Sequence, residues 1–134
     1  MGLILDTNVF IQAERSQKPI DFSQWQDYDE AFISVITVSE LLVGVHRAND
    51  ENRRLKRATF VESVIANIPA LPFDTESARI HAQVFALLAA QGQMIGAHDL
   101  IIAATALRYD YAVLTTNLSE FERVPNLNVI ALTK

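Results

Sequence analysis

Five side chains that carry oxygen ligands stand beside the ends of short apolar segments: Asp6, Glu40, Asp99, Asn117 and Glu120. Two carboxylates about 4 Å apart repel each other by about 4 kcal/mol at an effective dielectric constant of about 20. A fold that gathers three of them must therefore raise a pKa or bind a cation. The chain has no cysteine, and no pair of histidines stands with these residues. An all-oxygen site of this kind suits Mg²⁺ or Mn²⁺ and not zinc.

Each of these residues also has a simpler interpretation. Asp6 could cap the helix that follows it. Glu40 completes the pattern Thr-x-x-Glu with Thr37, which is typical of a capping box. Asp99 would gain about 0.3–1 kcal/mol at the positive end of its helix dipole, and the two later residues could belong to a turn and a surface helix. These interpretations explain the residues one by one but not their convergence. We therefore expect Asp99 to be a metal ligand held by a rigid helix, because residues 100–107 carry no charge and should be buried on every side.

Short apolar strands alternate with helical segments along the whole chain. This alternation predicts an α/β fold with a mainly parallel central sheet of about five strands. Such sheets bind ligands at the carboxyl ends of their strands, which is where the acids fall. The predicted strands are 2–6, 31–35, 70–73, 111–116 and 127–132. The predicted helices are 7–15, 37–48, 50–67, 74–91 (capped by Asp74) and 96–110, and residues 18–29 form a loop with a short helix.

The bulk properties of the chain are those of one globular domain. Its 134 residues, half of them hydrophobic, predict a single domain over 1–134. The N-terminus has no basic run before its short apolar stretch, and no apolar run approaches the roughly 18 residues of a membrane span. We therefore expect a cytoplasmic protein without a membrane partner. The net charge of −5 does not favour nucleic acid, so any such binding must depend on a local basic patch.

One segment could supply that basic patch, just after the helix that carries Glu40. We predict that it follows an RNA backbone beside the acidic residues, although it could equally be a solvated helix face. Arg123 could add to it. Trp25 and Tyr28 could stack on an unpaired base, but packing in the core or in a dimer is the better interpretation. The segment consists of Arg47, Arg53, Arg54, Lys56 and Arg57.

Four segments together resemble a known family. They read LILDTNVFI at the N-terminus, ISVITVSELLVGV at 33–45, IGAHDLIIAATAL at 95–107 and VLTTNLSEFERVPNLNVI at 113–130. In this order and spacing they resemble the PIN-domain ribonucleases, specifically the VapC-type toxins of bacterial toxin–antitoxin pairs. The resemblance implies a three-layer α/β/α sandwich and Mg²⁺- or Mn²⁺-dependent cleavage of RNA, with tRNA as the leading substrate. It also implies a homodimer and a small VapB-type antitoxin.

The resemblance implies a catalytic role for particular residues. Asp6, Glu40 and Asp99 match the acidic triad, which would hold one or two ions. Many members have a fourth acid where this chain has Asn117, and Glu120 could replace it, directly or through water. Thr115 or Thr116 would position a water or a carboxylate, and Thr7 and Asn8 would shape the loop behind the first acid. The reaction implied is attack by a metal-activated water, which leaves 5′-phosphate and 3′-hydroxyl ends.

Other classes of function stay open at this point. A dehalogenase-like phosphatase would need Asp-x-Asp after the first strand, but position 8 is Asn. A receiver domain would need a lysine after the last strand and a phosphorylated Asp in mid-chain, and this pattern is missing here. A non-catalytic binding module with the same fold is favoured only by Asn117. A metal-free nuclease would need histidines as acid and base. Only His98 lies near the site in sequence, and we expect it to be structural or to face the substrate.

Overall fold

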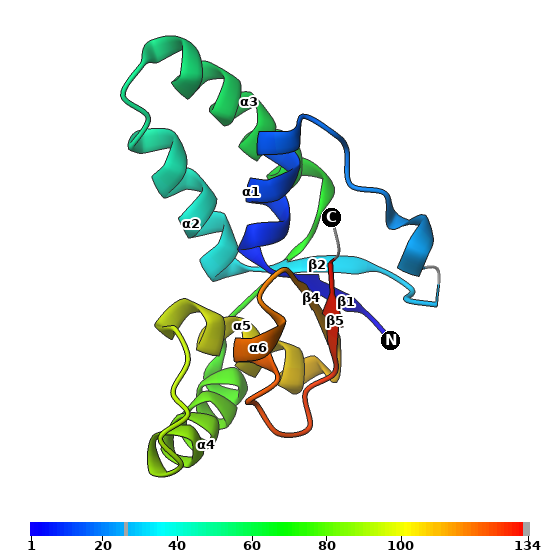
Figure 1. Ribbon diagram of the computed structural model, residues 1–134, viewed down its shortest axis with the longest axis vertical. Coiled ribbons are helices and arrows are strands. Elements are labelled where there is room, and N and C mark those ends of the chain that lie inside the picture. Colours follow the sequence, from blue (N-terminus) through cyan, green and yellow to red (C-terminus); the bar gives the residue numbers. More distant parts are fainter. Residues whose placement is uncertain (26, 133–134) are drawn as a thin grey trace.

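A parallel sheet runs through the computed structural model, which describes residues 1–25 and 27–132 (Figure 1). Within these residues five strands pair in the order β3-β2-β1-β4-β5, and every pair is parallel. The predicted sheet of about five strands is therefore confirmed. The strands are β1 (Leu3–Leu5), β2 (Ala31–Ser34), β3 (Ala70–Leu71), β4 (Ala112–Thr115) and β5 (Val129–Ala131).

Helices cover both faces of this sheet and make the predicted three-layer α/β/α sandwich. One buried cluster joins one face of the sheet to α1, α2 and α3, and a second joins the other face to α4, α5 and α6. None of the helices described is long and apolar enough to cross a membrane. The helices are α1 (Thr7–Ser16), the 3₁₀ helix η1 (Phe22–Trp25), α2 (Val35–His46), α3 (Glu51–Asn67), α4 (Thr75–Ala90), α5 (Ala97–Tyr109) and α6 (Leu118–Phe121).

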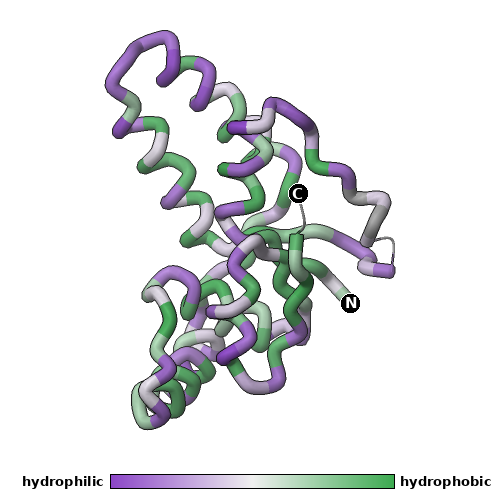
Figure 2. The backbone as a smooth tube through the Cα atoms, in the orientation of Figure 1, coloured by the Kyte–Doolittle hydropathy of each residue, from purple (hydrophilic) through white to green (hydrophobic). Residues whose placement is uncertain are grey.

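The two central strands alternate between the two cores. In β1, Leu3 and Leu5 enter the cluster on the α1 side, while Ile4 enters the cluster on the α5 side. Helix α5 is the buried helix that the uncharged run predicts, since every residue from 100 to 107 is buried or half-buried. Figure 2 shows the contrast between this inner helix and the hydrophilic outer turns of α2 and α3. Asp99 therefore lies in the first turn of a helix that packs into the centre of the protein.

The start of α2 differs from the prediction. The helix begins at Val35 and not at residue 37, because the Ser34 hydroxyl accepts a hydrogen bond from the Ile36 N–H and caps it. Thr37 is then inside the helix and fully buried. Glu40 lies in the second turn and not in the first. The capping-box interpretation of Thr37 and Glu40 is therefore wrong, and Glu40 is left without a local role.

The other predicted boundaries agree to within a few residues. Asp74 caps α4 as expected, accepting a hydrogen bond of 2.9 Å from the Ser77 N–H. Strand β3 stops at Leu71 and does not reach residue 73, because Pro72 has no N–H to donate to a neighbouring strand. β1 and β4 lie side by side at the centre of the sheet, and the chain leaves them toward opposite edges. Ligands of parallel sheets bind at such a switch point.

Candidate functional site

Asp6 lies directly after β1, at this switch point, and its carboxylate is buried. It is only 1% exposed. The Thr115 hydroxyl, at the end of β4, donates a hydrogen bond of 2.8 Å to Asp6 Oδ2 and accepts one of 2.8 Å from the Asn117 N–H. Asp6 occupies the N-cap position of α1, but its carboxylate makes no capping hydrogen bond. The capping interpretation of Asp6 therefore fails, because its side chain turns to the neighbouring strand.

Glu40 is held by residues of two other elements. Thr7, the first residue of α1, donates a hydrogen bond of 2.6 Å to Glu40 Oε1, and the Thr7 hydroxyl lies 3.0 Å from that of Thr37. On its other side, Glu40 Oε2 lies 3.1 Å from Nδ1 of His98 in the first turn of α5. The imidazole of His98 is half exposed. These contacts bring α1, α2 and α5 together around one carboxylate.

Asp99 and Glu120 face each other at the N-terminus of α5. The Gly96 N–H donates a hydrogen bond of 3.1 Å to Glu120 Oε1, and the Asn117 amide donates one to the second oxygen of the same carboxylate. Gly96 has no side chain, which gives Asp99 room, since a Cβ there would lie 3.3 Å from its Oδ2. The two carboxyls are close enough to share a hydrogen bond. Asn117 thus supports Glu120 rather than standing apart from the acids.

The electrostatics of these residues show an excess of negative charge. Burial raises the pKa of Asp99, and the charges of Asp6, Glu120 and Glu40 raise it further, to about 7. Burial also raises the pKa of Asp6, although the hydrogen bond from Thr115 opposes this. Burial alone would raise the pKa of Glu120, but the hydrogen bonds from Gly96 and Asn117 lower it overall. An acid that only favoured a helix dipole would have a lowered pKa, so the dipole interpretation does not suffice for Asp99.

The donor set of this site fits a divalent cation. It consists of carboxylate oxygens, which are the ligands that Mg²⁺ and Mn²⁺ prefer, and its charge is poorly compensated. Within the described residues, no group of three His, Asp or Glu side chains is arranged so that it could hold a metal ion by itself. Mg²⁺ keeps several of its waters and commonly takes only one or two carboxylates directly. Asp6 and Asp99 are the first candidates, and Glu40 and Glu120 lie near enough for their charges to act on Asp99.

The raised pKa of Asp99 gives a prediction for stability. The folded protein keeps the Asp99 proton between pH 3.8, where the unfolded chain loses it, and about 7. The free energy of unfolding should therefore fall as the pH rises through this window, and this contribution should level off above it. Urea unfolding at a series of pH values, with EDTA present, measures this. A slope that is unchanged in the Asp99→Asn variant would contradict the assignment.

The predicted basic patch is only partly free to bind a ligand. Arg54 donates hydrogen bonds of 2.7 Å to Glu51 and to the Ala48 carbonyl. Arg57 pairs with Glu14 of α1 at 3.3 Å and donates to the carbonyl of Gly44. Arg53 lies 4.0 Å from Asp50, whereas Arg47 and Lys56 are exposed and make no ion pair with any described residue. Two of the five cations therefore brace α3 against its neighbours, and the patch as a continuous unit stays a prediction.

These contacts separate the roles of two adjacent cations. Arg57→Ala should lower the free energy of unfolding by about 1 kcal/mol, since it removes one ion pair and one hydrogen bond from a half-exposed side chain. Lys56→Ala should leave stability unchanged and, if the segment contacts RNA, reduce the salt dependence of RNA binding by about one charge. Urea unfolding and salt-dependent filter binding measure the two effects. Equal effects of both variants on stability would contradict the assignment.

The remaining candidate residues from the sequence have contacts that define their roles. Trp25 is buried and Tyr28 is half-buried against the same core cluster, as packing predicts. Arg123 donates a hydrogen bond of 3.0 Å to the Met94 carbonyl and its charge acts on Glu120. Sequence reasoning missed the contact of His98 with Glu40, for which no local signal exists. The bridge from Thr7 to Glu40 also joins segments 33 residues apart.

Comparison with known proteins places this geometry in a family. The model of the PIN domain matches residues 3–127. A protein named Ribonuclease VapC from Rickettsia bellii is 42% identical over 132 residues, which is 98% of this chain and 97% of that relative. A protein named tRNA(fMet)-specific endonuclease VapC from Salmonella typhimurium is 36% identical over 97 residues, 72% of this chain and 71% of the relative. A crystal structure of DNA-bound VapBC from Salmonella typhimurium superposes with a TM-score of 0.83, at 31% identity, and covers 98% of each chain.

Proposed function

Because the chain belongs to the PIN-domain family and, within it, to the VapC ribonucleases, we propose that it is an endoribonuclease toxin of a toxin–antitoxin pair. It hydrolyses RNA phosphodiester bonds with the help of Mg²⁺ or Mn²⁺. The observation that carries the proposal is the group of carboxylates around the half-buried Asp99, because burial together with the charges of Asp6, Glu120 and Glu40 raises the pKa of Asp99 to about 7. A structural role gives no reason to collect this charge, whereas a cation site requires it.

The residues of the chain divide the work between them. Asp6 and Asp99 would hold the ion, and Glu40 and Glu120 would add negative charge around it. When bound, the ion would supply a water of lowered pKa and stabilise charge on the phosphoryl oxygens. Thr115 fixes the direction of the Asp6 carboxylate, and Thr7 with His98 fixes that of Glu40. Attack of water on phosphorus with departure of the 3′ oxygen leaves 5′-phosphate and 3′-hydroxyl ends.

Asn117 has a positioning role in this proposal. It stands where many family members have a fourth acid, and its amide donates to Glu120. Glu120 thereby provides the negative charge at this position, one turn later in the chain. The proposal does not require a second ion, because one hydrated Mg²⁺ commonly takes only one or two carboxylates directly, which Asp6 and Asp99 would supply.

The substrate and partner follow from the relatives. The relative from Salmonella typhimurium carries the name tRNA(fMet)-specific endonuclease, which makes tRNA the leading substrate for this chain. The solved neighbour is a VapBC assembly, which supports a VapB-type antitoxin as the inhibiting partner. The resemblance also implies a homodimer. An antitoxin arginine would find favourable electrostatics in the acidic site.

Cleavage assays test this function. Antitoxin-free protein is incubated with total tRNA and with rRNA in Mg²⁺, in Mn²⁺ and in EDTA. We expect cleavage of tRNA that requires the metal. Cleavage that persists in EDTA, or no cleavage of any RNA by protein that also binds no Mn²⁺, would overturn the proposal. The second of these results would favour a non-catalytic PIN-fold binding module.

A further inference from the structure

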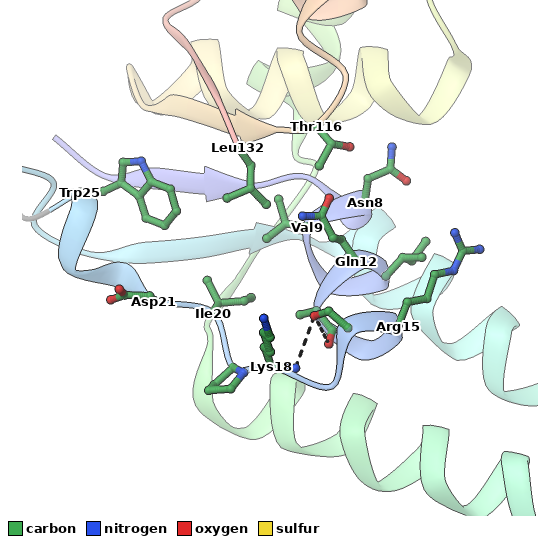
Figure 3. A pocket seen from close by; sticks show the side chains of 14 residues that line it. Asn8, Val9, Gln12, Arg15, Lys18, Ile20, Asp21, Trp25, Thr116 and Leu132 are labelled. Carbon is green, nitrogen blue, oxygen red and sulfur yellow. Dashed lines mark hydrogen bonds between the residues drawn. The ribbon is translucent and has the colours of Figure 1, made fainter. Parts of the chain in front are cut away.

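A hollow lies beside α1, lined in part by Asn8 and Thr116, which are close in sequence to Asp6 and Thr115 (Figure 3). Its cavity volume is about 670 Å³, which falls in the range of about 300–1,000 Å³ typical of sites for small ligands. It lies between α1, the segment 18–25 and the chain after β4 and β5. Trp25 and Thr116 line it from segments far apart in the sequence.

The pocket begins at the two chain segments that carry the buried acid and its partner. Asn8 comes two residues after Asp6, and Thr116 directly follows Thr115. Both Asn8 and Thr116 are exposed, and Figure 3 shows them at the same end of the pocket. A nucleotide next to a phosphate at the acidic site would therefore meet this opening first.

The lining has the chemistry that a nucleobase requires. Asn8 and Gln12 lie one turn apart on the same face of α1, and each amide offers both donors and an acceptor, which is how proteins read the edges of bases. Val9, Ile20 and Trp25 add apolar surface to the lining, with Trp25 at the end opposite Asn8 (Figure 3). Apolar surface with a few convergent amides is typical of a site that encloses a flat polar ring.

The rim of the pocket carries cations. Arg15 and Lys18 line it, are exposed, and make no ion pair with any residue that the structure describes. The carboxylate of Asp21, on the same rim, accepts a hydrogen bond from the Ser23 N–H, so the charged groups of the lining sum to about +1 in a chain of net charge −5. Arg15 also borders a smaller crevice of about 170 Å³ that Glu40 lines. An RNA backbone held by Arg15 would thus run between the acidic site and the pocket.

From this geometry we propose that the pocket binds an unpaired base of the RNA substrate, next to the cleaved bond, and that Gln12 selects the base. The inference rests on the proposed ribonuclease function and assigns it a specificity site. Asn8 and Gln12 read the edge of the base, the apolar surface covers its face, and Arg15 and Lys18 hold the adjoining phosphates.

The test uses Trp25, which is the single tryptophan of the chain and reports on the pocket by fluorescence. Short single-stranded RNAs of each base composition are titrated into the full chain in EDTA, where binding is read without cleavage. We expect a saturable change in Trp25 fluorescence that is strongest for one base. Gln12→Ala should weaken binding of that RNA by about tenfold and leave the others unchanged. Gln83→Ala, an exposed glutamine on α4, is the matched control and should change nothing.

A second readout separates this proposal from the ribonuclease function. Cleavage of an RNA hairpin library with a randomised loop, in Mg²⁺, should show one preferred base beside the cut, and Gln12→Ala should remove the preference. Metal-dependent cleavage with the same preference in Gln12→Ala, and no fluorescence change, would overturn the pocket and keep the ribonuclease. Base-selective binding without any cleavage would keep the pocket and overturn the ribonuclease function. A fluorescence change with the antitoxin but with no RNA would assign the pocket to the protein partner and overturn the proposal.

Discussion

Asp99→Asn is expected to abolish RNA cleavage and, at the same time, to make the metal-free protein more stable. The substitution keeps the size of the side chain but removes one of the carboxylates that crowd the start of α5. Loss of a metal ligand removes several kcal/mol of transition-state stabilisation, which corresponds to a rate at least about 10³-fold lower. Removing a partly buried charge and its repulsion should raise the free energy of unfolding near pH 8 by roughly 1 kcal/mol, after discounting for solvent screening.

A matched substitution at the other end of the same helix is the control. Asp110 is exposed and caps α5 in the left-handed conformation, at φ 58°, which asparagine tolerates well. Asp110→Asn removes the same charge and should change neither cleavage nor stability appreciably. Cleavage of tRNA and urea unfolding in EDTA measure both effects. An active Asp99→Asn variant would contradict the role of Asp99 as a metal ligand, and a variant less stable than the wild type would show that Asp99 has a structural role instead.

Thr115→Val is expected to lower cleavage by about 10- to 100-fold, although Thr115 touches no substrate. Its hydroxyl is the donor that holds the buried Asp6 carboxylate, and it also accepts from the Asn117 N–H. Valine has the same shape but removes both of these hydrogen bonds. The free energy of unfolding should therefore also fall, by about 1–3 kcal/mol.

Thr105→Val separates the positioning role from a general loss of packing. Thr105 is also fully buried, but its hydroxyl donates to the Ile101 carbonyl within α5 and lies outside the acidic group. This variant should lose stability and keep its rate of cleavage, and Thr115→Ser should restore most of the activity. Equal rates for the Thr115→Val and Thr105→Val variants would contradict the role assigned to the Thr115 hydroxyl.

Most of the fold could be predicted because its signals are local. Short apolar strands and capped helices follow one another clearly enough to give the sheet, its parallel pairing and the burial of α5. The sequence places the start of α2 at residue 37 and not at Val35, because both Ser34 and Thr37 offer a capping hydroxyl. Burial decides between them, since Thr37 packs inside against Thr7.

The acids of the site could be predicted for a different reason, because parallel strands bring their carboxyl ends to one edge. What the sequence does not contain is how each carboxylate is held. Thr7, which donates to Glu40, and Gly96, which donates to Glu120, come from distant segments. Glu14 also lies far along the chain from Arg57, and their ion pair reduces the free part of the basic patch. The pocket beside α1 is likewise built from four separate stretches of chain, so no run of residues announces it.

Binding of Mn²⁺, followed by the loss of its free electron paramagnetic resonance signal, tests the central claim most directly, because it needs no RNA. We expect the wild type and Asp110→Asn to bind Mn²⁺ saturably. Asp6→Asn and Asp99→Asn should bind at least about tenfold more weakly. Affinity in the wild type should rise with pH through about 7, as the ion displaces the proton of Asp99. No binding at millimolar Mn²⁺, or equal binding by all four proteins, would contradict a metal site built from these carboxylates.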